Sequence, residues 1–263
     1  RYGGVEPFLT GVHLPAIHSG INAAFDGDTD AHLTFDGYLI IDIETNYPLW
    51  FPRNTGVIGT QEYAWQTYYN NKYGYNAHAS GVWLTMARRL FDATIDKFKE
   101  LVPYGKISWY GFPNTLLTAL TNPAIFNETT GSIQAKHDLN NDLFSKLDFL
   151  TCELYNSMGR VIYNRPIING VGEVTSKDFC VAFNNACQEH SRVANNNSKP
   201  WITVLQPVYP PGRPEIINQP VAALDHNLIS QIALMNGASG LSIWLSLTDN
   251  GSVATGSIGM ATI

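Results

Sequence analysis

The sequence predicts an α/β fold built on parallel strands in a single domain, residues 1–263. Short apolar segments alternate with longer segments of helical period, which is the pattern of βα units. The short segments are apolar throughout, as expected for strands covered on both faces. Such a sheet is either open and doubly wound or closed into a barrel of TIM type. No glycine-rich phosphate loop follows any predicted strand, which counts against a nucleotide-binding open sheet.

Five strands and three helices are predicted. The strands are Tyr38–Ile43, Lys106–Tyr110, Phe149–Tyr155, Trp201–Gln206 and Gly240–Leu245. The helices are Ser80–Leu101, Ser176–Ala194 and Asp225–Asn236, with Asp225 as N-cap and Gly237 as C′ residue of the last. A closed barrel usually needs about seven or eight strands, more than the five found here. Because nothing before residue 35 has a strand pattern, the first strands of a barrel are expected to be missing from this chain.

Composition excludes several classes of function. Charged residues make up only 14% of the chain and the net charge is −6, so no nucleic-acid partner is expected. No apolar segment approaches the roughly 18 residues that span a bilayer. The seven His residues show no metal-ligand spacing and are expected to be solvated or locally hydrogen-bonded, so neither a metal nor another cofactor is predicted. Cys180 and Cys187 lie about 10 Å apart on a helix, which favours free buried thiols over a disulfide.

The segment GYLIIDIETNYPLW, residues 37–50, carries the predicted chemistry. In a strand, residues two apart point to the same face, so Asp42 and Glu44 project together with Cα atoms about 6.5 Å apart. Carboxyl groups this close separate in pKa, and one can donate a proton while the other stays ionised. Glycoside hydrolysis needs this arrangement, although a surface ion pair is an equally acceptable interpretation of Asp-x-Glu alone.

Residues 37–54 resemble the acid-bearing strand of the hyaluronidase family of glycoside hydrolases. The matching residues are Ile41, Asp42, Glu44, Pro48, Trp50, Arg53 and Asn54, with Ile43 where the family has Trp. Further segments resemble the family's motifs in the same order: Gly11, Leu14 and Pro15 before a helix, WYGFPN at 109–114, NDLFSKLDFLTCELYNS at 141–157 and GASGLSIW at 237–244. The resemblance implies a distorted barrel of about seven strands, no cofactor, and a polysaccharide substrate with N-acetylated sugars.

The resemblance also implies a retaining, substrate-assisted mechanism. Glu44 would protonate the glycosidic oxygen while the substrate's acetamido oxygen attacks the anomeric carbon. Asp42 would orient and stabilise that acetamido group, and Tyr110 would hydrogen-bond near it. Trp244 would form an apolar floor, with ordinary core packing as the alternative role. The other implied substrate-binding residues are Tyr155, Ser157, Asn114 and Tyr209, the last with packing in a Pro-rich loop as its alternative.

Some positions depart from the family's pattern. Gly159 stands where the family has a Tyr that grips the acetamido group, Asn156 replaces a Pro, and Thr115 replaces a Cys of the family's disulfides. The leading hypothesis is a secreted endo-glycosidase, with a lysosome-like compartment as the alternative location. The second is a weakly active or inactive relative with a structural or glycan-binding role, including assembly outside the cell. The third is an unrelated barrel hydrolase with two carboxylates. The sequons at Asn127, Asn196 and Asn250 are candidate glycosylation sites.

Overall fold

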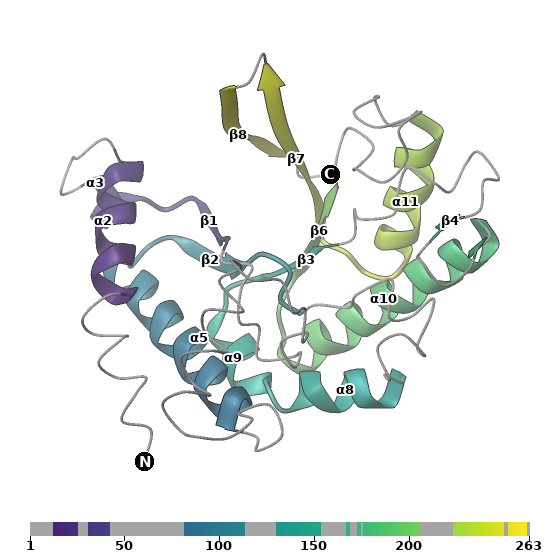
Figure 1. The fold of residues 1–263 in the computed structure, drawn as a ribbon, viewed down its shortest axis with the longest axis horizontal. Coiled ribbons are helices and arrows are strands. Elements are labelled where there is room, and N and C mark those ends of the chain that lie inside the picture. The colour runs from purple at the N-terminus through teal and green to yellow at the C-terminus, as the bar shows by residue number, and fades with distance from the viewer. Residues whose placement is uncertain are drawn as a thin grey trace. The chain divides into compact units, whose positions relative to one another are not determined.

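A computed structural model describes residues 13–25, 31–42, 82–113, 130–153, 167–168, 173–174, 176–205, 223–249 and 252–261. The chain divides into two compact units. Unit 1 comprises residues 1–110 and 139–148, and unit 2 comprises residues 111–138 and 149–263. Figure 1 shows the elements of both units.

Unit 1 is a parallel strand pair with helices packed beside it. Its elements are α2 (Leu14–Ala24), α3 (Ala31–Thr34), β1 (Tyr38–Ile41), α5 (Val82–Leu101), β2 (Lys106–Trp109) and α9 (Asn141–Lys146). Strands β1 and β2 pair from Tyr38 opposite Lys106 to Ile41 opposite Trp109. The apolar side of α5, with Leu90, Phe91 and Ile95, is buried, which confirms its predicted amphipathic pattern.

Helix α5 ends as predicted and leads directly into β2. The Gly105 N–H donates to the Val102 carbonyl at 3.2 Å, and Lys106 then donates to the Gly37 carbonyl at 2.8 Å to begin the ladder. A Cβ on Gly105 would lie 2.8 Å from Val102 Cγ1. Only glycine therefore allows this tight passage from helix to strand without a shift of Val102.

Unit 2 is a mixed sheet with helices. Its elements are α8 (Thr130–Asp138), β3 (Leu150–Glu153), β4 (Ile167–Ile168), β5 (Glu173–Val174), α10 (Ser176–Asn196), β6 (Trp201–Leu205), α11 (Ala223–Met235), β7 (Gly240–Asp249) and β8 (Ser252–Ala261). Strands β3, β6 and β7 are parallel neighbours in that order, and β8 pairs antiparallel with β7. Strands β4 and β5 form a separate antiparallel pair.

Helices α10 and α11 end in the same way. After α11, Gly237 has φ 87° and donates to the Leu234 carbonyl, while Ala238 donates to the Ala233 carbonyl, which is a Schellman motif. After α10, Ser198 has φ 53° and makes the corresponding bond to Asn195, while Lys199 donates to Ala194. The C′ role predicted for Gly237 is confirmed.

The sequence did not identify the same role for Ser198, because serine rarely adopts a positive φ. The N-cap predicted at Asp225 is wrong, since α11 begins two residues earlier, at Ala223.

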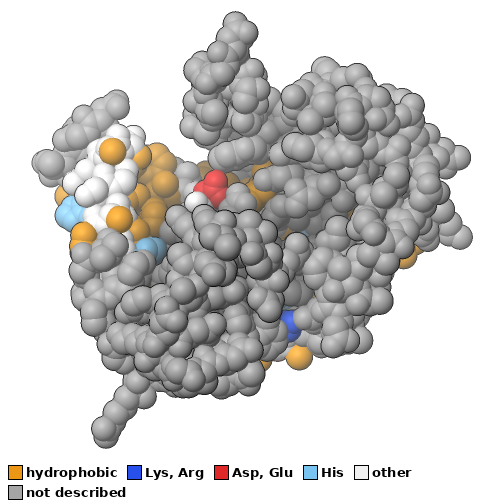
Figure 2. Space-filling model, in the orientation of Figure 1, with side chains coloured by type: hydrophobic (Ala, Val, Ile, Leu, Met, Phe, Trp, Pro, Cys, Tyr) orange, Lys and Arg blue, Asp and Glu red, His pale blue; other side chains and the backbone are white. Residues whose placement is uncertain are grey.

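All five predicted strands and all three predicted helices are present, with ends that differ by a few residues. Strand β1 is less covered than predicted, since only Ile41 is buried and Tyr38 is 59% exposed. In β2 only Lys106 is exposed. Figure 2 shows apolar surface of the described residues beside helices α2 and α3, with acidic surface next to it. The two-sided burial expected for parallel strands therefore holds for β2 but not for β1.

The strands that the structure describes form separate small sheets and do not close into a barrel. The barrel and the single domain therefore stay predictions. Among the described helices, none is both long enough and apolar enough to cross a membrane.

Candidate functional site

The carboxyl ends of β1 and β2 bring two of the predicted catalytic residues together. The Tyr110 N–H, directly after β2, donates to the Ile41 carbonyl at 2.8 Å, and Asp42 is the next residue after Ile41. Asp42 is exposed, whereas Tyr110 is 3% exposed. The carboxyl ends of parallel strands meet at the same edge of a sheet, and this edge of unit 1 presents a carboxylate beside a buried phenol.

The position of Tyr110 is fixed by the residues before it. The ring of Trp109 stacks on that of Phe91 in α5, with centroids 3.7 Å apart and planes 11° apart, and both side chains are fully buried. Earlier in β2, the Ile107 N–H donates to Asp148 Oδ2 at 2.9 Å, and the Asp148 N–H donates to the Ile107 carbonyl at 2.8 Å. Packing and hydrogen bonds thus hold β2 in place, and with it Tyr110, the residue that follows the strand.

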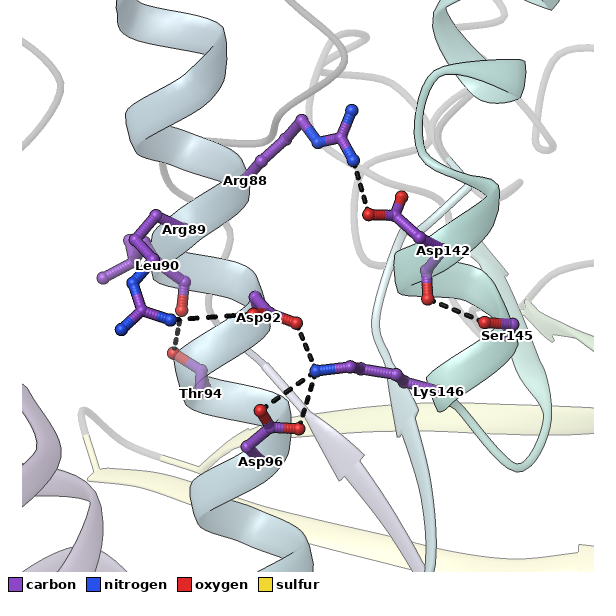
Figure 3. A network of polar contacts seen from close by, with 9 residues as sticks. All are labelled: Arg88, Arg89, Leu90, Asp92, Thr94, Asp96, Asp142, Ser145 and Lys146. Atoms are coloured by element: carbon purple, nitrogen blue, oxygen red, sulfur yellow. Dashed lines mark hydrogen bonds and ion pairs between the residues drawn. The ribbon is translucent and has the colours of Figure 1, made fainter.

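Helix α5, which leads into β2, is held to α9 by charged side chains (Figure 3). Lys146 of α9 contacts Asp92 and lies 2.8 Å from Asp96, both on α5. Arg88 of α5 lies 2.5 Å from Asp142 of α9. Partial burial opposes the charge of Lys146, but the carboxylates of Asp92 and Asp96 outweigh it and raise the pKa of that ammonium.

The loop after Tyr110 contacts strand β3. Gly111 has φ 64°, a conformation that favours glycine, and the Phe112–Pro113 peptide bond is cis. Phe112 is fully buried and forms an isolated antiparallel bridge with Thr151 of β3, which is also buried. Within unit 2 the loop that carries the WYGFPN motif is therefore tied to the strand that carries the predicted Tyr155 segment.

The other predicted site residues are described only in part. Trp244 lies in β7 opposite Ser257 of β8, and the structure describes its backbone alone. Asn196, the last residue of α10, is exposed, as a glycosylation site requires. The remaining predicted residues lie outside the described part of the chain: Glu44, Asn114, Tyr155, Ser157, Tyr209, Asn127 and Asn250. The convergence of the full set on one site stays a prediction.

A buried polar cluster in unit 2 was not anticipated from the sequence. His137 Nδ1 of α8 lies 2.5 Å from Glu189 Oε1 of α10, and these side chains are 1% and 6% exposed. Arg192 donates to both oxygens of Glu189 at 2.8 Å and to Asp138 Oδ1 at 2.7 Å. Burial alone would raise the pKa of Glu189, but hydrogen bonds from Arg192 and His137 lower it to about 2. Glu189 is therefore ionised in a nearly dry site.

The expectation that the histidines are solvated or locally bonded is wrong for this part of unit 2. His137 bonds across 52 positions of the sequence, and the neighbouring His190 is fully buried. Burial lowers the pKa of His190 to about 3, with a further contribution from His137. The one sequence signal for the cluster is the spacing of Glu189 and Arg192, three residues apart on a helix.

The two thiols whose side chains the structure describes, Cys152 of β3 and Cys187 of α10, are free and buried, as predicted. Burial raises the pKa of both, that of Cys187 to about 12, so neither is a thiolate at neutral pH. In the described ranges no three His, Cys, Asp or Glu side chains are placed to hold a metal ion together.

The parallel strands and the helices between them are those of an α/β protein, and comparison with known structures identifies similar folds. No protein-family model matches the sequence, and no curated protein sequence does. A crystal structure of bee venom hyaluronidase has a similar fold, with a TM-score of 0.66 over 91% of this chain and 71% of that one, at 15% sequence identity. The structure of bee venom hyaluronidase in complex with a hyaluronic acid tetramer is similar at a TM-score of 0.62 and 16% identity, over 85% of this chain and 65% of that one.

At such low identity the comparison shows the fold alone. The chain therefore has a hyaluronidase-like fold, and the resemblance predicted from its motifs is confirmed at that level.

Proposed function

We propose that the chain is an endo-acting glycoside hydrolase of the hyaluronidase type, acting on a polysaccharide with N-acetylhexosaminide linkages. The observation that supports it most is the placement of Asp42 and Tyr110 at adjoining carboxyl ends of β1 and β2, in a chain with a hyaluronidase-like fold. Secretion, a distorted barrel of about seven strands and glycosylation at Asn196 belong to the same proposal.

In this mechanism Glu44 gives its proton to the glycosidic oxygen as the bond to the anomeric carbon breaks. The acetamido oxygen of the same sugar forms the new bond to that carbon and gives a cationic oxazolinium ring. Asp42 stabilises the positive charge and Tyr110 orients the acetamido group. Water then attacks the anomeric carbon and the bond from that carbon to the acetamido oxygen breaks, while the Glu44 carboxylate takes a proton from the water; this restores the acetamido group and retains the configuration.

The test is the release of reducing ends from N-acetylated polysaccharides by the full chain. Glu44→Gln keeps the shape of the acid and removes its proton, so we expect turnover to fall by roughly a hundredfold or more. Glu100→Gln, on the exposed end of α5 beside Lys97, is the matched control and should keep full activity. Equal turnover in wild type and Glu44→Gln would contradict the proposal.

A second function is favoured by one observation, the Gly159 that replaces the family's acetamido-gripping Tyr. It is a weakly active or inactive relative that binds glycans or assembles into an extracellular structure. Glycan binding by the wild type without any release of reducing ends would favour it over the first proposal.

A further inference from the structure

The strand pair that carries Asp42 and Tyr110 at its carboxyl ends is anchored mainly through β2. In β1 only Ile41 is buried and Tyr38 is largely exposed, so this strand is only partly held by the core. In β2 every residue after Lys106 is buried. The ladder sets Tyr110 relative to Ile41, but the place of the whole pair in unit 1 depends on what β2 contacts.

Two side-chain contacts described for β2 hold it at different distances from Tyr110. Earlier in the strand, Asp148 Oδ2 accepts a hydrogen bond from the Ile107 N–H at 2.9 Å. The Asp148 side chain is 29% exposed, so water can replace that bond. Directly before Tyr110, the ring of Trp109 stacks on Phe91 of α5, with centroids 3.7 Å apart. Both rings are fully buried, so water cannot take the place of either one.

The segment of α5 around Phe91 has little freedom to adjust. Leu90 and Thr94 are buried, and the Thr94 hydroxyl donates to the Leu90 carbonyl at 2.7 Å. A close-packed interior transmits a displacement instead of absorbing it. A change in the shape of the Phe91 side chain should therefore move Trp109, and with it the Tyr110 backbone one peptide bond away.

Building on the proposed glycosidase function, we infer that Phe91 is a positioning residue of that reaction. Its ring sets the place of Trp109, and through Trp109 the place of the Tyr110 side chain that orients the acetamido group. Phe91 is fully buried, so it acts through Trp109 and not on the glycan. Because the acetamido group must be oriented when its oxygen attacks, the loss of Phe91 should lower kcat more than it raises KM.

The experiment measures kcat and KM of the full chain on a soluble N-acetylated oligosaccharide. Phe91→Leu removes the ring and keeps an apolar side chain. We expect kcat to fall between roughly tenfold and a hundredfold, as for a group displaced by about 1 Å, while KM stays within about twofold. Circular dichroism gives the folded fraction, and kcat is expressed per folded molecule, so a loss of stability alone leaves it unchanged.

Leu101→Val is the matched control, because it removes apolar volume from the same helix at another place. Leu101 is buried in a cluster with Ile17, Ile21 and Val102, which contains neither Phe91 nor Trp109. This variant should keep the kcat of the wild type. If Phe91→Leu fails to fold, Phe91→Met takes its place, since methionine also lacks the ring and adapts to irregular spaces.

A double-mutant cycle tests whether Phe91 acts through Trp109. Trp109→Leu removes the other ring of the stack and should itself lower kcat. In that background Phe91→Leu should lower kcat by less than about twofold more, because the stack is already lost. If the two effects multiply in full, Phe91 acts by another route and the inference is overturned.

The outcomes separate this inference from the proposed function. Glu44-dependent cleavage with an unchanged kcat in Phe91→Leu overturns the inference and leaves the proposed function intact. Equal losses of kcat in Phe91→Leu and Leu101→Val overturn it as well.

If the wild type cleaves nothing, the proposed function fails, and the place of Tyr110 is then measured directly. Fluorine NMR of the chain labelled with 3-fluorotyrosine gives a signal for Tyr110, which its loss in Tyr110→Phe identifies. A shift of that signal in Phe91→Leu but not in Leu101→Val supports the positioning by Phe91. A signal that stays in place, or that shifts equally in both variants, overturns it.

Discussion

The two units hold their helices with charged side chains in opposite surroundings. In unit 1, Lys146 bridges Asp92 and Asp96 at the surface, where its own side chain is 35% exposed and that of Asp96 is 57% exposed. In unit 2, His137, Glu189 and Arg192 join α8 to α10 with two of the three side chains almost fully buried. We name these the exposed clamp (Arg88, Asp92, Asp96, Asp142, Lys146) and the buried clamp (His137, Asp138, Glu189, Arg192).

The difference shows how the same interaction depends on its surroundings. An exposed ion pair gains little, because water already solvates both charges and salt screens them. A buried pair is costly to form, yet removing one partner leaves an uncompensated charge in a dry site. The exposed clamp should therefore tolerate loss of a member, and the buried clamp should not.

The largest effect is expected from breaking the buried clamp. Arg192→Met keeps the length of the side chain but leaves Glu189 with His137 alone, so we expect unfolding free energy to fall by about 3 kcal/mol. Urea denaturation followed by circular dichroism measures it. Arg88→Met, at the exposed clamp, is the matched control and should cost less than about 1 kcal/mol. Equal losses in the two variants would remove the distinction between the clamps.

The buried histidine beside this clamp predicts how stability depends on pH. His190 has a pKa of about 3 in the fold against an ordinary 6.5, so between these values the unfolded chain binds the extra proton. The contribution of neutral His190 to the free energy of unfolding is complete above pH 6.5 and decreases as the pH falls, by about 2 kcal/mol at pH 5. In His190→Phe, which keeps a ring against Trp201, the loss between pH 7 and pH 5 should shrink by that amount. An unchanged difference between the two pH values would refute the assignment.

Glu189 predicts a second decrease in stability at lower pH. Its pKa is about 2 in the fold against an ordinary value of 4.5, so its contribution is complete above pH 4.5. It decreases as the pH falls from 4.5 toward 2. Denaturation midpoints of the wild type over that range should fall more steeply than those of Glu189→Gln. Parallel curves for the two proteins would argue against an ionised Glu189.

A smaller change in stability is expected at the C-terminal end of α10, the helix that carries Glu189 and Arg192 of the buried clamp. Ser198→Gly relieves a non-glycine residue at φ 53° and should stabilise the chain by about 1 kcal/mol. Gly237→Ser is the reciprocal change after α11 and should destabilise by a similar amount. The gain from Ser198→Gly should persist in the Arg192→Met background, since the two sites act independently. A gain that disappears there would show that the clamp and the helix end are coupled.

The smallest effect belongs to the exposed clamp. Lys146→Met should lower stability by about 0.5 kcal/mol at low salt, and less at high salt, because the pairs with Asp92 and Asp96 are screened. Denaturation at two salt concentrations measures it. A loss as large as that of Arg192→Met, or one independent of salt, would show that water and salt do not weaken the ion pairs of the exposed clamp.

Most of the secondary structure was predictable from the sequence because it depends on local pattern. The period of α5, the apolar segments of all five strands, and Gly237 at a helix end each depend on residues within a few positions of one another. The motif that contains Asp42 and Glu44 was also visible, as was its resemblance to a family whose fold the structure shares. These features were determined by the sequence alone.

Contacts between distant segments were decided only by the tertiary structure. The pairing of β1 with β2 sets Tyr110 beside Asp42, and the packing of α8 on α10 buries His137, His190 and Glu189. A histidine or glutamate has the same local pattern whether its partner lies in water or on another helix. Burial, and with it the pKa of each group, is a property of the surroundings that only folding creates.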